Sequence, residues 1–429
     1  MNKEFNIAVV GLGQIGSYLL NELNIKRKDI LNKTGKKINI VAISAKNKNK
    51  KRSFKINKSI FYSNPLEIIK KKKIDILFEA IGSSDGISKK IVEAALKKKI
   101  HVITPNKALI SKHGDYLSKL AEKNKVNLEF EASVCGGIPI LRTIKEGLAT
   151  NKISKVYGIL NGTSNYILSE METTKNSFSN VLKKAQLLGY AELGNPKLDL
   201  NGYDALAKVK ILSSLSFNNK ISNSKCLMEG IENIEYKDIE IVDQLNYRIK
   251  LLGITEIINS NLFERVHPCL VKKNTYIGNV YGVMNAVILE GKPVGESVLQ
   301  GEGAGPGPTS SALMSDLLSI LRGNIKFPFG ISDKKRKKVK IYNINKYSNA
   351  LYLRLEVKDK PGVLSSITKQ LAKYNISVKR LIQIPDHKKK TASIAIITHD
   401  ANEQNSKKCI KSFKANINII KSPVLIRLF

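Results

Sequence analysis

The chain has 429 residues and a formal net charge of +36, because 72 lysines and arginines stand against 36 aspartates and glutamates. This length is long for one domain and predicts two or three. No run of about 18 apolar residues occurs, and the N-terminus leads directly into a strand pattern, which excludes a membrane span and a signal peptide and predicts a cytoplasmic protein.

The positive charge raises the question of nucleic-acid or membrane binding, because a basic face attracts phosphates. The lysines recur along the whole chain, for example at 46–55, 70–73 and 334–338, together with frequent Ile and Asn. Trp is absent, and no basic run carries interleaved aromatic residues that would stack on bases. We therefore interpret the excess as solvated surface and expect neither a nucleic-acid nor a membrane partner.

The cysteines indicate a reducing compartment. They lie far apart and form no CxxC pair, which argues against a disulfide framework and against a zinc cluster. We expect them to be reduced and mostly buried: Cys135, Cys226, Cys269 and Cys409.

The first pattern along the chain is strand, glycine turn and helix. Residues 5–10 form an apolar run, and helical spacing continues from Ser17. Gly11 permits the tight turn, Gly13 lets the backbone approach a pyrophosphate, and Gly16 allows close packing of helix on strand. A lone GxGxxG arises by chance, but further strand patterns follow here, which indicates a dinucleotide-binding unit. Those strand patterns are 38–43, 74–80 and 100–104.

The end of the second strand bears on cofactor choice. An NAD-specific unit usually has Asp or Glu there, to hold the ribose hydroxyls. This chain has Ser44-Ala45-Lys46, which favours a 2′-phosphate and predicts a preference for NADP. The alternative is that these cations belong only to the general lysine excess. The basic residues that follow are Lys48, Lys50, Lys51 and Arg52.

Three polar turns follow strand patterns farther along. The turn 104–107 lies at a strand end, where open α/β sheets place ligands, so Lys107 could reach the cofactor or substrate. Residues 129–140 read as a strand breaking into a glycine turn, whose carbonyls could bind an ion. Residues 160–168 read as a strand followed by a helix start, which can hold a carboxylate. Each, taken alone, is equally consistent with an ordinary turn.

The segment 189–208 concentrates acid and base groups. It places Glu192, Asp199, Asp204 and Lys208 just before an apolar helical run. Asp204 and Lys208 are four residues apart, so on a helix they share a face. A surface ion pair is one interpretation. The other is a lysine in a closed cleft that passes a proton to a substrate oxygen.

The last third of the chain contains a loop, a linker and a new unit. Residues 301–309, rich in Gly and Pro, predict a backbone-lined pocket ahead of a helix at 310–321, and 326–348 read as a basic linker. The remainder predicts a small ferredoxin-like module from its strand, helix, strand, strand order. The patterns are a strand at 351–357, a helix through 372, and strands near 376–383 and 391–398.

Together these segments resemble homoserine dehydrogenases, the oxidoreductases that link aspartate semialdehyde and homoserine on the route to threonine, methionine and isoleucine. The ordered motifs are GLGQIGSYLL, TPNKALI, EASVCGGIPI, GILNGTSNYIL, GYAE with DLNGYDALAK, and GEGAGPGPT; YLRLEVKDKPGVL resembles the start of an ACT domain. The match spans almost the whole chain, with no aspartokinase segment, so we expect a monofunctional enzyme. It implies an α/β architecture: a Rossmann-type NAD(P)-binding domain at 1–133, an α+β catalytic and dimerisation domain at 134–325, the linker, and a ferredoxin-like ACT domain at 349–429.

The resemblance also implies residue roles. Lys208, supported by Asp204, would donate a proton to the reacting oxygen, with Lys107 as a second candidate and a further substrate contact. Glu192 and Asp199 would hold the substrate ammonium group. A monovalent cation, Na⁺ or K⁺, would be bound mostly by carbonyls at Glu131, Val134, Gly136 and Ile138. The cofactor would contact Gly11, Gly13, Gln14, Ile15, Gly16, Lys46, Thr104, Asn106, Lys107 and Gly303.

An ACT domain implies control by an amino acid, and threonine is the expected effector, received near Gly362. A homodimer or homotetramer is expected. The chain departs from the family in the loop 193–198, which is one residue longer and has Asn195 in place of a common Asp, and at 304–309, where an extra proline stiffens the loop. Substrate contacts from the first loop are therefore open.

Three other functions are compatible with parts of the sequence. A nucleic-acid-binding protein would be retained on DNA or RNA with a steep salt dependence. A non-catalytic NADP-dependent regulator would lose the catalytic lysines, yet Lys107 and Lys208 are both present. A dehydrogenase acting on another amino-acid semialdehyde would differ only in pocket details.

Overall fold

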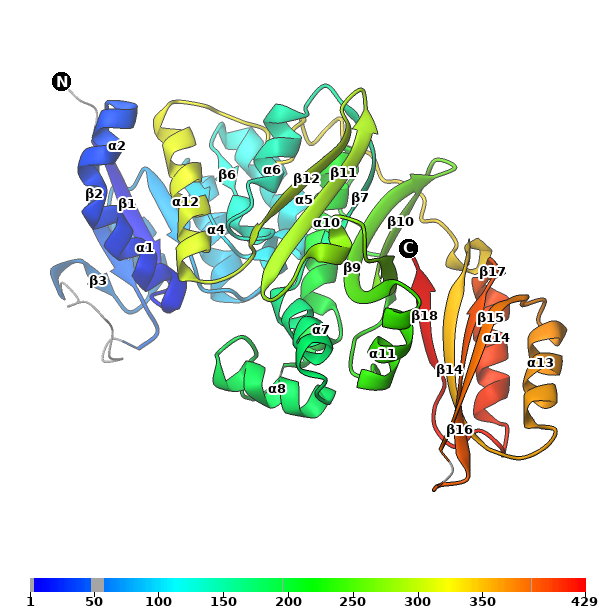
Figure 1. Ribbon diagram of the computed structural model, residues 1–429. Coiled ribbons are helices and arrows are strands. Elements are labelled where there is room, and N and C mark those ends of the chain that lie inside the picture. Colours follow the sequence, from blue (N-terminus) through cyan, green and yellow to red (C-terminus); the bar gives the residue numbers. More distant parts are fainter. Residues whose placement is uncertain (1–3, 48–57, 195, 387) are drawn as a thin grey trace.

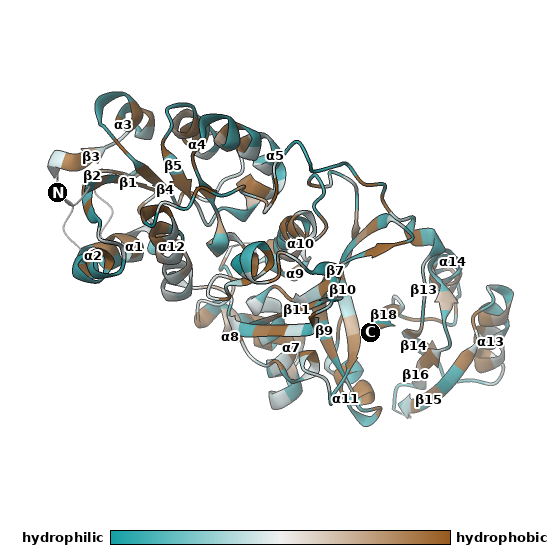
Figure 2. Ribbon diagram, turned by 90° about the horizontal axis from the view of Figure 1, so that it is seen from above, coloured by the Kyte–Doolittle hydropathy of each residue, from teal (hydrophilic) through white to brown (hydrophobic). Residues whose placement is uncertain are grey.

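The structure is a computed structural model that describes residues 4–47, 58–194, 196–386 and 388–429. Three parts follow one another along the molecule, with the N-terminal unit at one end and the C-terminal helices at the other (Figures 1 and 2). Peripheral helices such as α3 and α4 carry both hydropathy colours in Figure 2, as expected for helices with one buried face.

The N-terminal part is a six-stranded parallel sheet with strand order β3-β2-β1-β4-β5-β6, which confirms the predicted Rossmann-type unit. Both faces of β1 are buried, with Ile7 and Val9 on one side and Ala8 and Val10 on the other. The strands are β1 (Glu4–Val10), β2 (Lys37–Ser44), β3 (Phe61–Tyr62), β4 (Ile76–Glu79), β5 (His101–Ile103) and β6 (Leu128–Glu129); the helices are α1 (Gln14–Ile25), α2 (Arg27–Thr34), α3 (Pro65–Lys71), α4 (Ile87–Lys97) and α5 (Lys107–Asn124).

Helix α12 (Pro306–Leu321) returns to this unit from far along the chain. Its buried residues Leu313, Leu317 and Leu321 belong to the same core cluster as Leu19 and Leu23 of α1. Figure 1 shows α12 beside α1. The predicted boundaries put this helix in the catalytic domain, whereas its packing puts it on the Rossmann sheet. A linear boundary could not show this, because the apolar face of α12 meets residues almost 300 positions earlier.

The central part is an antiparallel layer whose strands run in the order β12-β11-β7-β9-β10, with helices on one face. The predicted strand followed by a helix start at 160–168 agrees with the structure to within two residues, because the strand before it ends at Ile159 and α7 begins at Gly162. Asn161 caps this helix by accepting a hydrogen bond from the Ser164 amide at 2.8 Å. The strands are β7 (Lys152–Ile159), β8 (Leu227–Met228), β9 (Tyr247–Ile258), β10 (Asn261–Lys272), β11 (Met284–Lys292) and β12 (Gly295–Glu302); the helices are α6 (Ile140–Arg142), α7 (Gly162–Thr174), α8 (Phe178–Leu187), α9 (Lys197–Leu200), α10 (Tyr203–Ser216) and α11 (Tyr236–Gln244).

The C-terminal part has the predicted ferredoxin-like order, and its sheet runs β18-β14-β16-β15. Its last strand also pairs with β10 in parallel, through Cys269 with Arg427 and Leu270 with Leu428, so the central and C-terminal sheets are one continuous sheet. β18 lies between β10 and β14 in Figure 1. The elements are β13 (Ser348–Asn349), β14 (Leu351–Lys358), α13 (Val363–Lys373), β15 (Val378–Asp386), β16 (Thr391–Thr398), β17 (Ala401–Asn402), α14 (Glu403–Lys414) and β18 (Val424–Leu428).

The segment 326–348, expected to be a basic linker, is packed along the central part. Four of its lysines are exposed, which agrees with the solvated-lysine interpretation: Lys334, Lys335, Lys337 and Lys338. Arg336 and Phe329, however, are buried. The segment also joins the layer of strands, because the Leu262 amide donates to the Lys340 carbonyl at 2.8 Å. It therefore acts as a packed strap.

All four cysteines are free thiols, and three of them are buried. Within the described ranges, every helix is too short or too polar to cross a membrane. The same ranges contain no group of three or more His, Cys, Asp or Glu residues arranged to hold a metal ion.

Candidate active site

The glycine turn opens onto a cavity of about 540 Å³ at the carboxyl ends of β1 and β2. Gly11 has φ +94°, and a Cβ there would lie 2.4 Å from the Ala80 carbonyl oxygen. A Cβ at Gly16 would lie 1.8 Å from the Gly11 carbonyl oxygen, whereas one at Gly13 would meet nothing within 4 Å. Gln14 and Ile15 begin α1 at this turn. The turn is therefore tight on its inner side and open at Gly13.

The predicted phosphate-binding cations are only partly described. Lys46 is exposed and lines the cavity, beside Ser44 and Ala45. The basic residues that follow it, Lys48, Lys50, Lys51 and Arg52, lie outside the described residues.

A buried carboxylate that the sequence analysis missed organises the neighbouring strand ends. Glu79, at the end of β4, accepts hydrogen bonds from the Thr104 hydroxyl at 2.6 Å and from the Ile81 amide at 2.8 Å. Asn106 donates to the Ser83 carbonyl at 2.8 Å and caps α5 by accepting from the Leu109 amide. The available signal was a carboxylate that ends an apolar parallel strand, the position where such sheets bind ligands.

The structure brings Lys107, Asp204 and Lys208 together, although they come from two domains. Lys107 is the first residue of α5, and its Nζ lies 2.9 Å from Asp204 Oδ1. Lys208 Nζ lies 2.8 Å from the other oxygen, Asp204 Oδ2, and also donates to the Leu160 carbonyl at 2.5 Å. The Lys208 side chain is 9% exposed and that of Lys107 is 41% exposed. One carboxylate therefore holds a buried and a half-exposed ammonium group.

The charges of this triad are mutually stabilised. Burial alone would raise the pKa of Asp204, but attraction to Lys208 and Lys107 and hydrogen bonds from both hold that pKa well below its usual range. Burial would lower the pKa of Lys208, but attraction to Asp204 raises it above its usual value. Lys208 therefore remains a protonated ammonium group at neutral pH, which is the state that a proton donor needs.

A second carboxylate lies next to the triad. Asn161 donates from Nδ2 to Asp199 Oδ1 at 2.8 Å and to Asp204 Oδ2 at 3.0 Å, so one amide joins both carboxylates. Burial and then the charge of Asp204 raise the pKa of Asp199. Asn161 is also the cap of α7, so the start of that helix lies beside the carboxylates of Asp199 and Asp204. Glu192 lies in the exposed turn after α8, and Asn195 lies outside the described residues.

The predicted cation-binding turn and the glycine loop lie against each other. Val134, Gly136 and Ile138 are buried, and a Cβ at Gly136 would lie 2.8 Å from the Gly303 carbonyl oxygen. The Glu131 carboxylate is already engaged, because it accepts the amides of the residues that begin α6, Leu141 and Arg142, each at 2.8 Å. Its carbonyl accepts the Val134 amide at 3.3 Å, which leaves the second lone pair of that oxygen for an ion.

Comparisons with known proteins agree over the whole chain. Residues 139–318 match the homoserine dehydrogenase family model, residues 11–131 match the model of the NAD-binding domain of homoserine dehydrogenase, and residues 351–419 match the ACT domain model. Among curated relatives, the homoserine dehydrogenase of Neisseria gonorrhoeae is 37% identical over 99% of both chains, and that of Helicobacter pylori is 37% identical over 100% of both. The chain belongs to the homoserine dehydrogenase family. The crystal structure of a homoserine dehydrogenase from Thiobacillus denitrificans has the same fold, with 34% identity, a TM-score of 0.91, and 100% of this chain and 98% of that chain covered.

These matches confirm the predicted family, its domain types and the reaction. A homoserine dehydrogenase is an NAD(P)-dependent oxidoreductase that interconverts aspartate semialdehyde and homoserine in amino-acid biosynthesis. The Rossmann sheet and the 540 Å³ cavity belong to the NAD-binding domain, and the β14–β18 unit is an ACT domain.

Proposed function

We propose that Lys208 protonates the carbonyl oxygen of aspartate semialdehyde as it is reduced, and takes the proton back from homoserine in the reverse direction. The triad of Lys107, Asp204 and Lys208 carries this proposal. The bound nicotinamide cofactor supplies the hydride. Lys208 is buried and charged, and two of its three N–H groups are directed at Asp204 and the Leu160 carbonyl. The direction of the third N–H is therefore fixed, and this is the proton that is donated. Lys107 is half-exposed at the start of α5, where it can contact both substrate and cofactor.

Asp199 and the start of α7 give the substrate its orientation in this proposal. The Asp199 carboxylate, with Glu192 from the neighbouring exposed turn, would attract the ammonium group of the amino acid. The amide groups and the positive dipole end at the start of α7 favour a negative group, which suits the α-carboxylate. With the ammonium group and the α-carboxylate held in this way, the aldehyde end of the substrate would point toward Lys107 and Lys208.

We expect the enzyme to use NADPH more efficiently than NADH. No carboxylate closes β2, and the Lys46 ammonium lies on the rim of the cavity where a 2′-phosphate would be attracted. The measurement is kcat/KM for each cofactor with aspartate semialdehyde. This assay also tests the reaction itself: equal efficiencies would overturn only the preference, whereas no turnover with either cofactor would overturn the catalytic proposal.

The glycine turn gives a prediction with an internal control. Gly16→Ala should lower the melting temperature, because its Cβ would lie 1.8 Å from the Gly11 carbonyl oxygen. Gly13→Ala should leave the melting temperature unchanged, because its Cβ meets nothing within 4 Å, yet weaken NADPH binding by about tenfold or more if a pyrophosphate lies against it. Fluorescence titration with NADPH and thermal melts check both. Unchanged affinity for NADPH in Gly13→Ala would contradict the placement of the pyrophosphate at this turn.

We also propose that the turn 131–138 binds Na⁺ or K⁺ through its carbonyls. Gly136 has φ +26°, and the turn is buried against the loop that contains Gly303. Carbonyl oxygens suit hard monovalent cations. Rates and melting temperatures in K⁺, Na⁺ and tetramethylammonium buffers test this; identical values in all three would contradict it.

The open face of the central sheet supports a homodimer. Tyr157, Val271 and Ile288 line a hollow of about 660 Å³ there, and the neighbouring Val298 and Tyr276 are exposed apolar groups. A face of this kind is typical of self-association. Sedimentation equilibrium at micromolar concentration tests it, and a monomer would contradict it.

A cytoplasmic location remains our proposal, as expected for an enzyme that works in biosynthesis and under reducing conditions.

We propose that threonine binds the ACT domain and inhibits the reaction. Gly362 has φ +85° and forms the exposed turn between β14 and α13, with open space where a Cβ would lie. Gly362→Asn keeps this backbone accessible, because Asn tolerates the left-handed region. We expect threonine to inhibit the wild type and to inhibit this variant at least about tenfold more weakly, with an unchanged uninhibited kcat. Activity that threonine does not alter would end the proposal.

A further inference from the structure

Arg336 is the most completely buried charged group of the strap, and the proposed mechanism does not use it. Its guanidinium side chain is 0% exposed. It donates to Asp115 Oδ1 at 2.6 Å, to Ser214 Oγ at 2.5 Å and to the Asn219 carbonyl at 3.1 Å, and a further nitrogen lies 3.3 Å from Asp333 Oδ1. A planar guanidinium presents five N–H donors, so it can satisfy more acceptors at once than the three-donor ammonium group of a lysine.

Two of these acceptors come from the two helices that carry the catalytic lysines. Asp115 lies in α5, eight residues after Lys107, and Ser214 lies in α10, six residues after Lys208. At 1.5 Å per residue the guanidinium therefore lies about 12 Å along one helix and about 9 Å along the other from the lysines. The two helices are joined at Asp204 near their starts and at Arg336 farther along.

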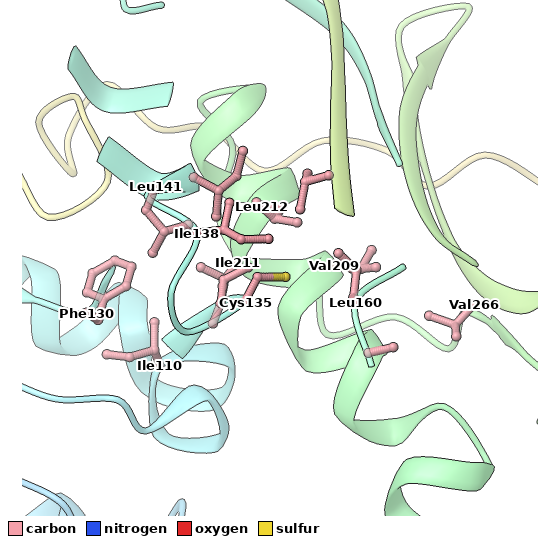
Figure 3. Close-up of a cluster of buried hydrophobic side chains, with 14 of the residues drawn as sticks. Ile110, Phe130, Cys135, Ile138, Leu141, Leu160, Val209, Ile211, Leu212 and Val266 are labelled. Carbon is pink, nitrogen blue, oxygen red and sulfur yellow. The ribbon is translucent and has the colours of Figure 1, made fainter. Parts of the chain in front are cut away.

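The strap packs into this junction with apolar contacts as well. The Arg336 guanidinium lies 3.9 Å above the ring centre of Phe329, which itself contacts Phe130 at 5.2 Å between ring centres. Gly114 of α5 allows this approach, because a Cβ there would lie 2.9 Å from the Phe329 ring. Figure 3 shows Ile110 of α5 and Leu212 of α10 in the hydrophobic cluster that also contains Phe130.

From this geometry we propose that Arg336 is a positioning residue for the reaction: it fixes α5 against α10 so that Lys107 and Lys208 share Asp204. The proposal rests on the roles given to these lysines above. Lys107 comes from the NAD-binding domain and Lys208 from the catalytic domain, so their separation depends on how the domains meet. Asp115 reinforces the contact, because its carboxylate also accepts the Ile221 amide at 3.1 Å.

The strap also gives this positioning a route to the ACT domain. It leaves the junction, bridges Asn219 through Lys337 and Leu262 through Ile341, and then enters β14. Any movement of the ACT domain that displaces the strap would displace Arg336 first and the two lysines only through it. A displacement of about 1 Å at the reacting groups can cost about 100-fold in rate.

The test compares Arg336→Lys with Lys335→Gln, an exposed neighbour in the same strap. We expect Arg336→Lys to lower kcat by about tenfold or more with little change in the KM for NADPH, and Lys335→Gln to match the wild type. Asp115→Asn removes the negative charge of this contact on α5 with little change of shape, so it provides the result if Arg336→Lys fails to fold.

The pH dependence of kcat separates positioning from simple stabilisation. If Lys107 moves away from Asp204, the carboxylate loses one of the two cations that hold its pKa down, so the acid limb of the kcat profile should move to higher pH in Arg336→Lys and Asp115→Asn. A lower melting temperature with unchanged kcat and an unchanged acid limb in both variants would overturn the proposal. Full activity of Lys208→Met would instead overturn the lysine roles, so the two failures are distinguishable.

Discussion

Replacing Lys208 by Met is expected to lower kcat for aspartate semialdehyde reduction by about 10²- to 10⁴-fold, the usual contribution of a positioned proton donor. Met keeps most of the buried volume and removes the ammonium group, whose Nζ lies 2.8 Å from Asp204 and 2.5 Å from the Leu160 carbonyl. Lys107 remains to pair with Asp204, so the carboxylate is not left uncompensated. NADPH oxidation followed at 340 nm, with a thermal melt of each protein, measures the effect.

Lys210→Met is the matched control, because Lys210 lies on the same helix and is partly exposed. It should keep the wild-type kcat. Lys107→Met should raise the KM for aspartate semialdehyde more than it lowers kcat, since a group that contacts the substrate in both ground and transition states mainly affects binding. If Lys107→Met abolishes turnover and Lys208→Met does not, the two lysine roles are reversed.

Local patterns predicted most of the fold because the features that decide it are local. The alternation of β14 and the glycine turn after β1 act within a few residues, and the structure confirms both units. The packing of α12 on α1 and the pairing of β18 with β10 join residues that are more than 150 positions apart. The periodicity of apolar residues and the residues that favour turns do not show which distant segments pack or pair with each other.

The candidate site was predicted unevenly for the same reason. Asp204 and Lys208 share a helical face, so their contact follows from a four-residue spacing. Lys107 joins them only through the domain junction, and Glu79 and Arg336 act through buried contacts that a lysine-rich sequence hides. Arg336 in particular stands among exposed lysines, so composition alone gave the opposite expectation for it.

The junction between the catalytic and ACT parts is also polar and buried. Arg354 of β14 donates to Asp238 of α11 at 2.6 Å, and Arg427 of β18 pairs with Glu229 of the central part at 2.7 Å. Arg427 also pairs with Glu403 of α14, inside the ACT domain, at 2.7 Å. Buried ion pairs are poor sources of net stability but define one arrangement, because a shifted arrangement leaves charges unpaired. The continuous sheet and the two pairs that cross the junction therefore favour the arrangement of the ACT domain on the catalytic part that the structure shows.

Replacing Asp204 by Asn is expected to lower kcat by about 100-fold or more and to move the alkaline limb of its pH profile to lower pH. Asp204 is the main group that raises the pKa of Lys208, while burial acts to lower it. Without the carboxylate, burial dominates and the Lys208 pKa falls. Because proton donation requires the ammonium form, activity is then lost at a lower pH than in the wild type.

Asp243→Asn supplies the comparison for this change. Asp243 pairs with Lys273 at 2.5 Å, but its side chain is 49% exposed, so water replaces the lost contact and kcat should stay at the wild-type level. In Asp204→Asn the two ammonium groups of Lys107 and Lys208 lose their shared counter-charge, and their mutual repulsion favours deprotonation of the more buried one. An alkaline limb that stays in place while kcat falls would show that Asp204 orients Lys208 without setting its proton affinity. A pH-independent, wild-type kcat would remove Asp204 from the mechanism altogether.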